Sequence, residues 1–320
     1  MNETNITVID DLPPQIMNIG YSGQLESSND PQAFVVTLLE HSNLPEASVA
    51  VSANNSAVNV EYASRLLHEA GSAKDVALTV FGGLSDNSTY EAVLRFCDDY
   101  GNCAESGALQ FSVGTCNGNK QLLAVKTYEQ SSVFEQAAAD ISGLCLSVLN
   151  RSTSTTPPAS YLEKFDAVVW STGTDMVNIN DDDAAALADY YGKKGKIVVE
   201  GSDVAFRHGS DDFMRSVLRS ELEADLGFTV TSVANMSNLS INITRLHPIV
   251  YELPSHLPFN ATIDPFPDAV LPYNGSVELA AWDGLDTTGA AMVAYESGTG
   301  SFKSLFLPFS VDALIAKPEE

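Results

Sequence analysis

Basic residues are the scarcest chemical class in this chain. Its 320 residues contain 16 Lys and Arg against 42 Asp and Glu, which gives a formal net charge of −26 and a pI near 4.3. Nucleic acids and anionic membranes are bound by cationic side chains that neutralise phosphate groups, so a surface of this sign repels both. We therefore exclude nucleic acid as a partner.

Apolar runs long enough to span a bilayer are also missing, and no leader-like segment precedes Asn2. We expect no membrane span in this chain, and we expect the chain to be an excised portion of a longer secreted precursor. Hydrophobic residues make up 44% and charged residues 18% of the sequence, so it can bury real cores. At this length, two domains are the default expectation.

Cysteine is rare, and the four present show neither a CxxC pair nor a Cys/His cluster, which excludes a zinc site. Cys97 and Cys103 flank the turn sequence DDYGN, so a disulfide between them would join two arms of a hairpin. Cys116 precedes the first strand of the parallel sheet expected below, and Cys145 starts the second. Neighbouring parallel strands begin at the same end of a sheet, which predicts a second disulfide. Four free thiols are the alternative.

Asparagine forms far more glycosylation sequons than chance predicts. With 20 Asn and 53 Ser and Thr in the chain, roughly three N-x-[ST] motifs are expected at random. The sequence contains ten, which predicts an extracellular glycoprotein, with Asn87 and Asn274 as the first sites because SDNST and PYNGS are turn-like. The ten positions are Asn2, Asn5, Asn54, Asn87, Asn150, Asn235, Asn238, Asn242, Asn260 and Asn274.

Residues 1–115 are predicted to form an all-β immunoglobulin-like sandwich. Seven short apolar or alternating runs follow one another between turn signals, which is typical of antiparallel sheets. The stretch YEAVLRFCDDYGNCAESGALQFSV resembles the last hairpin of immunoglobulin-like modules in secreted bacterial and archaeal proteins. The Cys-Trp-Cys core of antibody domains is absent, so that subtype is not implied.

Residues 116–320 are predicted to form an α/β parallel-sheet domain. Strand-like runs (QLLAVKTY, LCLSVLN, FDAVVWSTG, KIVVEGS) alternate with helix-like ones (VFEQAAADIS, NINDDDAAALADYYGKKG, DDFMRSVLRSELEADLG), and this alternation favours right-handed crossovers. Asn180 is the expected N-cap of the second helix, because three aspartates follow it. The tail AAMVAYESGTGSFKSLFLPFS is expected to add two edge strands.

The order of these elements, with GKIVVEGSDVAFRHGSDDFMRSVL, LHPIV and SLFLPFSVDAL, resembles the class I glutamine amidotransferase-like (flavodoxin-like) fold over residues 116–315. The resemblance implies a G-x-C-x-G nucleophile elbow after KIVVEGS and a distant His followed by Glu. Here Gly201 or Ser202 occupies the elbow, and Ile249 stands where a carboxylate should follow His247. A serine whose base is not oriented is a poor nucleophile, so we expect a degenerate, non-catalytic domain.

The carboxyl ends of parallel strands form a crevice where α/β folds bind ligands. Asp175, Ser202, Asp203 and His208 are predicted to line its rim, with His247 placed there by the resemblance. Two carboxylates near a histidine and a serine could hold a divalent cation or a sugar. The alternative is a solvated acidic rim on which Asp203 caps a helix. No other cofactor is predicted.

The sequence thus predicts a non-catalytic extracellular surface protein with a structural, adhesive or cell-envelope (S-layer) role. The expected partners are other cell-surface proteins, glycans, or further copies of the chain. One alternative is a secreted hydrolase or glycan-binding domain that uses the crevice. Another is a pair of accessory modules belonging to a larger enzyme.

Overall fold

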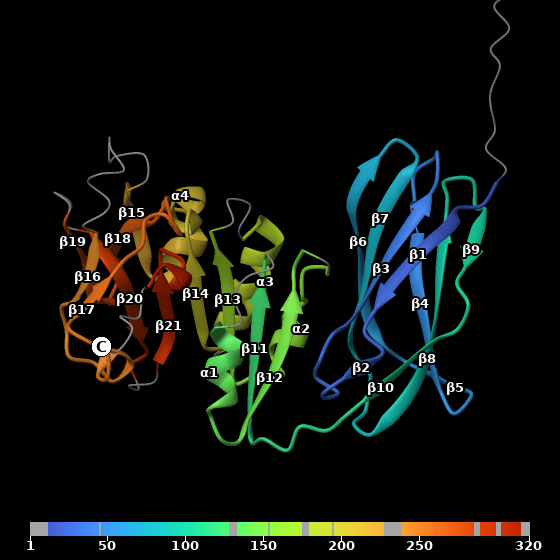
Figure 1. The fold of residues 1–320 in the computed structure, drawn as a ribbon, viewed down its shortest axis with the longest axis horizontal. Coiled ribbons are helices and arrows are strands. Elements are labelled where there is room, and N and C mark those ends of the chain that lie inside the picture. The colour runs from blue at the N-terminus through green and yellow to red at the C-terminus, as the bar shows by residue number, and fades with distance from the viewer. Residues whose placement is uncertain are drawn as a thin grey trace, which may run out of the picture. The chain divides into compact units, whose positions relative to one another are not determined.

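The computed structural model describes residues 12–44, 46–127, 133–152, 154–174, 179–193, 195–226, 239–284, 289–298 and 302–314. The chain divides into two compact units (Figure 1). The first unit is Met1–Cys116 with Thr153–Thr155, and the second is Asn117–Ser152 with Thr156–Glu320. The division after Cys116 falls inside the sequence GTCNGNK.

The first unit is a sandwich of two sheets. One sheet has the order β1 (Gln15–Tyr21), β3 (Gln32–Leu39), β7 (Ala73–Gly82), β6 (Glu61–Ala70). The other has the order β2 (Gln24–Leu25), β10 (Leu109–Val113), β8 (Ser88–Cys97), β4 (Glu46–Ala53), β5 (Ser56–Val58), with β9 (Cys103–Glu105) paired to β8. The described strands pair antiparallel except β2 with β10. The prediction of an all-β first domain is confirmed at this level.

Alternation along the strands builds the core of this sandwich. In β3, Phe34, Val36 and Leu38 are fully buried while the residues between them are half-buried, and β8 alternates in a similar way. Successive side chains of a strand point to opposite faces, so each strand gives one face to the core. Burying a large apolar side chain contributes about 2 kcal/mol, which makes this core the main stabilising feature of the unit.

The structure contains two disulfides. Cys97 and Cys103 are paired directly across β8 and β9 and are bonded to each other. Cys116 and Cys145 are also disulfide-bonded, and no cysteine is free. Because Cys97 and Cys103 are bonded to each other, the second disulfide joins Cys116 and Cys145. The alternative of four free thiols is therefore wrong.

The second unit is built on a single mixed sheet. Its first five strands run parallel in the order β12 (Leu144–Asn150), β11 (Lys120–Lys126), β13 (Ala167–Gly173), β14 (Ile197–Gly201), β21 (Phe302–Leu307). The sheet continues antiparallel through β20 (Ala290–Glu296), β19 (Val277–Asp283), β16 (Ser240–Ile243) and β17 (His256–Pro258). A further antiparallel pair, β15 (Ser220–Asp225) with β18 (Asp268–Pro272), joins the sheet through β20.

Short helices connect these strands. They are α1 (Val133–Ala139), α2 (Ala159–Leu162), α3 (Asp181–Gly192), α4 (Val204–His208), a π-helix η1 (Met214–Leu218) and the 3₁₀ turns η2 (Pro248–Val250) and η3 (Val311–Ala313). The longest, α3, begins with the expected cap: the side chain of Asn180 accepts from the backbone N–H of Asp183, and the Asp183 carboxylate accepts from the N–H of Asn180.

The prediction of an α/β parallel-sheet domain is wrong. The structure is predominantly β, with 49% strand and 15% helix, and its sheets are mixed. The segment DDFMRSVLRSELEADLG, predicted as one helix, forms η1 and then strand β15. Its Glu, Ala and Leu residues have good helix propensity, but antiparallel pairing with β18, more than 40 residues later, overrides that local preference.

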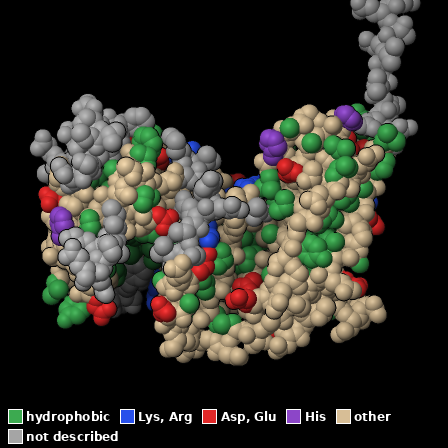
Figure 2. Space-filling model, in the orientation of Figure 1, with side chains coloured by type: hydrophobic (Ala, Val, Ile, Leu, Met, Phe, Trp, Pro, Cys, Tyr) green, Lys and Arg blue, Asp and Glu red, His purple; other side chains and the backbone are tan. Residues whose placement is uncertain are grey.

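Acidic side chains outnumber basic ones on the face of the molecule shown in Figure 2, in keeping with the net charge of −26. Within the described ranges, no helix combines the length and apolar composition that a membrane crossing requires.

Candidate functional site

Strand β14 ends in a tight turn, Gly201–Ser202–Asp203, that leads directly into α4. Gly201 has a φ of 140°, and a Cβ built at this position would lie 1.8 Å from Oγ1 of Thr172 and 2.9 Å from the backbone N of Gly173. Asp203 has a φ of 58°. A residue with a side chain is held in such a conformation at a cost of about 1–3 kcal/mol, and it persists only where its surroundings enforce it. The surrounding structure therefore enforces the conformation of this turn.

Ser202 is buried, with 1% of its surface exposed. Its backbone N–H donates to the carbonyl of Gly173 at 2.7 Å, and its hydroxyl donates to Oδ1 of Asp264 at 2.6 Å. Asp264 also accepts backbone N–H groups from Phe266 at 3.1 Å and Ser310 at 2.8 Å. Ser202 and Asp264 thus fasten the turn after β14 to two loops that are distant in sequence.

Glu200, the residue before Gly201, points into the same region of the unit and is 1% exposed. Its carboxylate accepts the hydroxyl of Ser171 and, at 3.1 Å, the backbone N–H of Val311. Burial raises the pKa of Glu200 to about 7, although both hydrogen bonds act in the opposite direction. The side chain therefore titrates near neutral pH.

Three aspartates converge beside this turn from three different elements. Asp203 precedes α4, Asp225 ends β15, and Asp268 begins β18, where it faces Asp225 in the strand register. One carboxylate oxygen from each lies within 4.8 Å of the oxygens of the other two, and the three residues are 4%, 7% and 0% exposed. Oδ2 of Asp268 accepts the backbone N–H of Phe206 at 3.0 Å, which holds this carboxylate against α4. We call these three residues the aspartate cluster.

Burial raises the pKa of Asp203 to about 6 and that of Asp268 to about 8. Repulsion from Asp225 and Asp264 adds to the effect in both cases. Burial also raises the pKa of Asp264 itself. The charged neighbours that raise the pKa values of Asp203 and Asp268 are thus carboxylates. A positive charge placed between them would stabilise the ionised form of both.

His247 does not join Ser202. Its Nε2 lies 3.1 Å from Oε1 of Glu296, and its Nδ1 accepts the backbone N–H of Ile249 at 3.2 Å. Glu296 pairs with the first residue of β21, which runs parallel to β14, whereas Ser202 follows the last residue of β14. Ile197 is level with Ser304, two residues after Phe302, so Glu296 and Ser202 lie seven strand residues apart along the sheet. At about 3.3 Å per residue this is roughly 23 Å. The expectation that His247 lacks a carboxylate partner is wrong, because Glu296 fills that role from a distant strand.

The remaining rim candidates lie elsewhere. His208 ends α4 with its Nδ1 2.8 Å from Oδ2 of Asp211 and its Nε2 3.0 Å from the carbonyl oxygen of Ile179, so both ring nitrogens are engaged. Asp175 lies outside the described residues. Of the predicted set, the structure brings together Ser202 and Asp203, and both are buried rather than lining an open rim.

Sequence reasoning missed Asp225, Asp264 and Asp268. Asp225 lies in a segment whose sequence predicts a helix, and the other two lie in the proline-rich stretch TIDPFPDAV, which has no recognisable motif spacing. The one local signal is that Asp268 directly precedes the apolar run AVL, where strand β18 begins.

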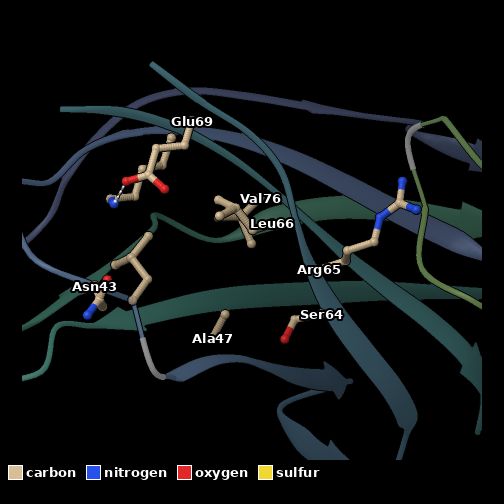
Figure 3. A pocket seen from close by; sticks show the side chains of 9 residues that line it. Asn43, Ala47, Ser64, Arg65, Leu66, Glu69 and Val76 are labelled. Carbon is tan, nitrogen blue, oxygen red and sulfur yellow. Dashed lines mark hydrogen bonds and ion pairs between the residues drawn. The ribbon is translucent and has the colours of Figure 1, made fainter. Parts of the chain in front are cut away.

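A cavity lies in the first unit (Figure 3). It has a volume of about 310 Å³ and opens where β6, β7 and the start of β4 meet. Lys74, which is 4% exposed, donates to the carboxylate of Glu69 at its wall, while Leu66 and Val76 give it an apolar side. Its one buried cation is thus already paired, and the cavity contains none of the predicted site residues.

No protein-family model and no curated protein matches this chain. No family model therefore supports the amidotransferase-like resemblance.

Two solved structures illustrate the similarity found. One is a cycloisomaltooligosaccharide glucanotransferase from Paenibacillus sp., with 10% identity, a TM-score of 0.24, and coverage of 70% of this chain and 30% of that one. The other is a family 123 glycoside hydrolase from Clostridium perfringens, with 8% identity, a TM-score of 0.25, and coverage of 55% and 43%. This chain therefore spans less than half of either protein. Scores of this size establish neither a shared fold nor a shared activity.

Proposed function

We propose that this protein is a non-catalytic extracellular surface component with a structural or adhesive role. The observation that carries the proposal is the placement of Ser202. Its hydroxyl is buried and donates to Asp264. His247, the base that the amidotransferase-like resemblance implies, lies at the opposite end of the parallel strands. A serine hydroxyl that is closed to substrate and distant from the histidine that would activate it does not act as a nucleophile.

The first unit supports a surface role. Its strand order β1-β3-β7-β6 facing β10-β8-β4 corresponds to the ABED and GFC sheets of immunoglobulin-like sandwiches, which are common in cell-surface proteins. Two disulfides suit an oxidising compartment. Other surface proteins, glycans or further copies of the chain are the partners we propose.

N-linked glycans are expected at Asn54, Asn87 and Asn274. All three are exposed and have positive φ (49°, 55° and 47°), and exposed surface positions are the ones that carry this bulky modification. Asn242 is the internal control, because it lies half-buried in β16 with its side-chain amide bonded to Asp283 and its carbonyl to His256.

Glycopeptide mapping of protein from its native source measures this occupancy. We expect sugar on the three turn sites and none on Asn242. Unmodified peptides at all three turn sites would contradict both the glycans and the extracellular location that they support.

A further inference from the structure

The aspartate cluster is more than a group of acidic residues, because part of it is buried without protein partners. Among the described residues, neither carboxylate oxygen of Asp203 accepts a hydrogen bond, and Oδ1 of Asp268 also accepts none. Asp203 is 4% exposed and Asp268 is 0% exposed. A buried carboxylate oxygen left in this way costs several kcal/mol unless it is protonated or bound to a cation.

We propose that Asp203, Asp225 and Asp268 together bind one Ca²⁺ ion. The inference stands on their convergence and on the unpartnered oxygens of Asp203 and Asp268, and it is independent of the proposed surface role. The ligands of one Ca²⁺ lie about 2.3–2.6 Å from it, so any two of them can be no more than about 5 Å apart. The oxygens of the cluster, all within 4.8 Å of one another, meet that condition.

The donor set favours a hard cation. The cluster offers only carboxylate oxygens, whereas zinc prefers nitrogen and sulfur ligands, and the nearby His208 is engaged by Asp211 and Ile179. Ca²⁺ takes about six to eight oxygens, of which the cluster supplies one from each of its three carboxylates, and more where a carboxylate binds through both atoms. Mg²⁺ keeps several waters and fits a site this buried less well. Ca²⁺ is therefore the ion that the chemistry selects.

Binding would tie together parts of the chain that are distant in sequence. Asp203 belongs to the turn after β14, while Asp225 and Asp268 belong to the cross-strand pair of β15 and β18. An unfolded chain does not hold these residues near one another, so the ion binds only the folded state and stabilises it by mass action. Ca²⁺ is expected to cross-link the turn after β14 to the β15–β18 pair.

The test compares thermal unfolding of the full chain after removal of metals with a chelator. Added CaCl₂ is expected to raise the unfolding midpoint of the second unit by about 5 °C or more, and MgCl₂ at equal concentration by clearly less. The Asp203→Asn/Asp225→Asn variant should fold without Ca²⁺, because it removes buried charges, and should lose the shift. Asp189→Asn is the matched control, since Asp189 is exposed on α3 and pairs with Lys193; its shift should equal that of the wild type.

Terbium provides a second readout that does not depend on stability. The indole N–H of Trp282 donates to the backbone oxygen of Asp268 at 2.9 Å, so excitation of this ring should sensitise Tb³⁺ bound at the cluster. We expect emission that saturates at one ion per chain, that Ca²⁺ displaces, and that the double variant lacks. Equal Ca²⁺ shifts in the wild type and the double variant would overturn the proposal, because they would reflect general binding to an acidic surface. No Ca²⁺ shift in the wild type, or an equal shift with Mg²⁺, would overturn it as well.

Discussion

Gly201→Ala is expected to destabilise the second unit by about 3 kcal/mol or more. The new Cβ would lie 1.8 Å from Oγ1 of Thr172, a residue that is 0% exposed and whose side chain therefore has no free space to move into. The substitution also places a side chain on a backbone with a φ of 140°. Backbone strain of this kind and overpacking of a buried site each cost about 1–3 kcal/mol.

Urea unfolding followed by tryptophan fluorescence measures this effect, because Trp170 and Trp282, the two tryptophans of the chain, both lie in the second unit. Gly192→Ala is the matched control. Gly192 is the exposed last residue of α3 and has no atom within 4 Å of its ideal Cβ, so alanine there should leave stability unchanged or raise it by less than about 1 kcal/mol. Equal unfolding midpoints for Gly201→Ala and the wild type would show that the turn is not as tightly built as described.

Glu200→Gln is expected to stabilise the second unit at alkaline pH by about 2–3 kcal/mol. The folded-state pKa of Glu200 is raised from 4.5 to about 7 by burial, so ionisation of the folded protein costs free energy that ionisation of the unfolded chain does not. Glutamine removes this cost. Its amide can still accept the backbone N–H of Val311 and donate to Ser171, which preserves the hydrogen bonds of the native side chain.

The sign of the pH dependence follows from the raised pKa. Below the unfolded value of 4.5 both states are protonated and the penalty is absent; it grows as the pH rises toward about 7 and is constant above that. The variant should therefore match the wild type near pH 4.5 and exceed it most at about pH 8.5. The exposed Glu252 gives the control, since Glu252→Gln should show no such trend. A stability difference between Glu200→Gln and wild type that does not change with pH would contradict the raised pKa of Glu200.

The strands of the first unit could be predicted because their information is local. Alternation in AFVVTLLE and TYEAVLRFC marks one buried face per strand, and β3 and β8 form where the pattern places them. The cap of α3 is equally local, since Asn180 and Asp183 are three residues apart and satisfy each other. In these segments, propensity, pattern and tertiary packing agree.

The second unit could not be predicted in full, because pairing between distant segments decides it. SELEAD becomes a strand only through DAVLP, and no property of either segment alone specifies that partner. The aspartate cluster depends on the same pairing, since Asp225 and Asp268 meet only when β15 and β18 are in register. Asp203 was identified as a site candidate from its place after a strand, but its ligand-forming neighbours required the three-dimensional structure.

We propose that the turn after β14 has a structural role in which Ser202 is buried and does not act as a nucleophile. Incubating the folded protein with a fluorophosphonate probe, which modifies activated serine hydroxyls, and mapping the peptides tests it most directly. We expect Ser202 to remain unmodified, because its hydroxyl is 1% exposed and bonded to Asp264. Stoichiometric modification of Ser202 in the folded wild type, abolished in His247→Ala, would contradict the claim.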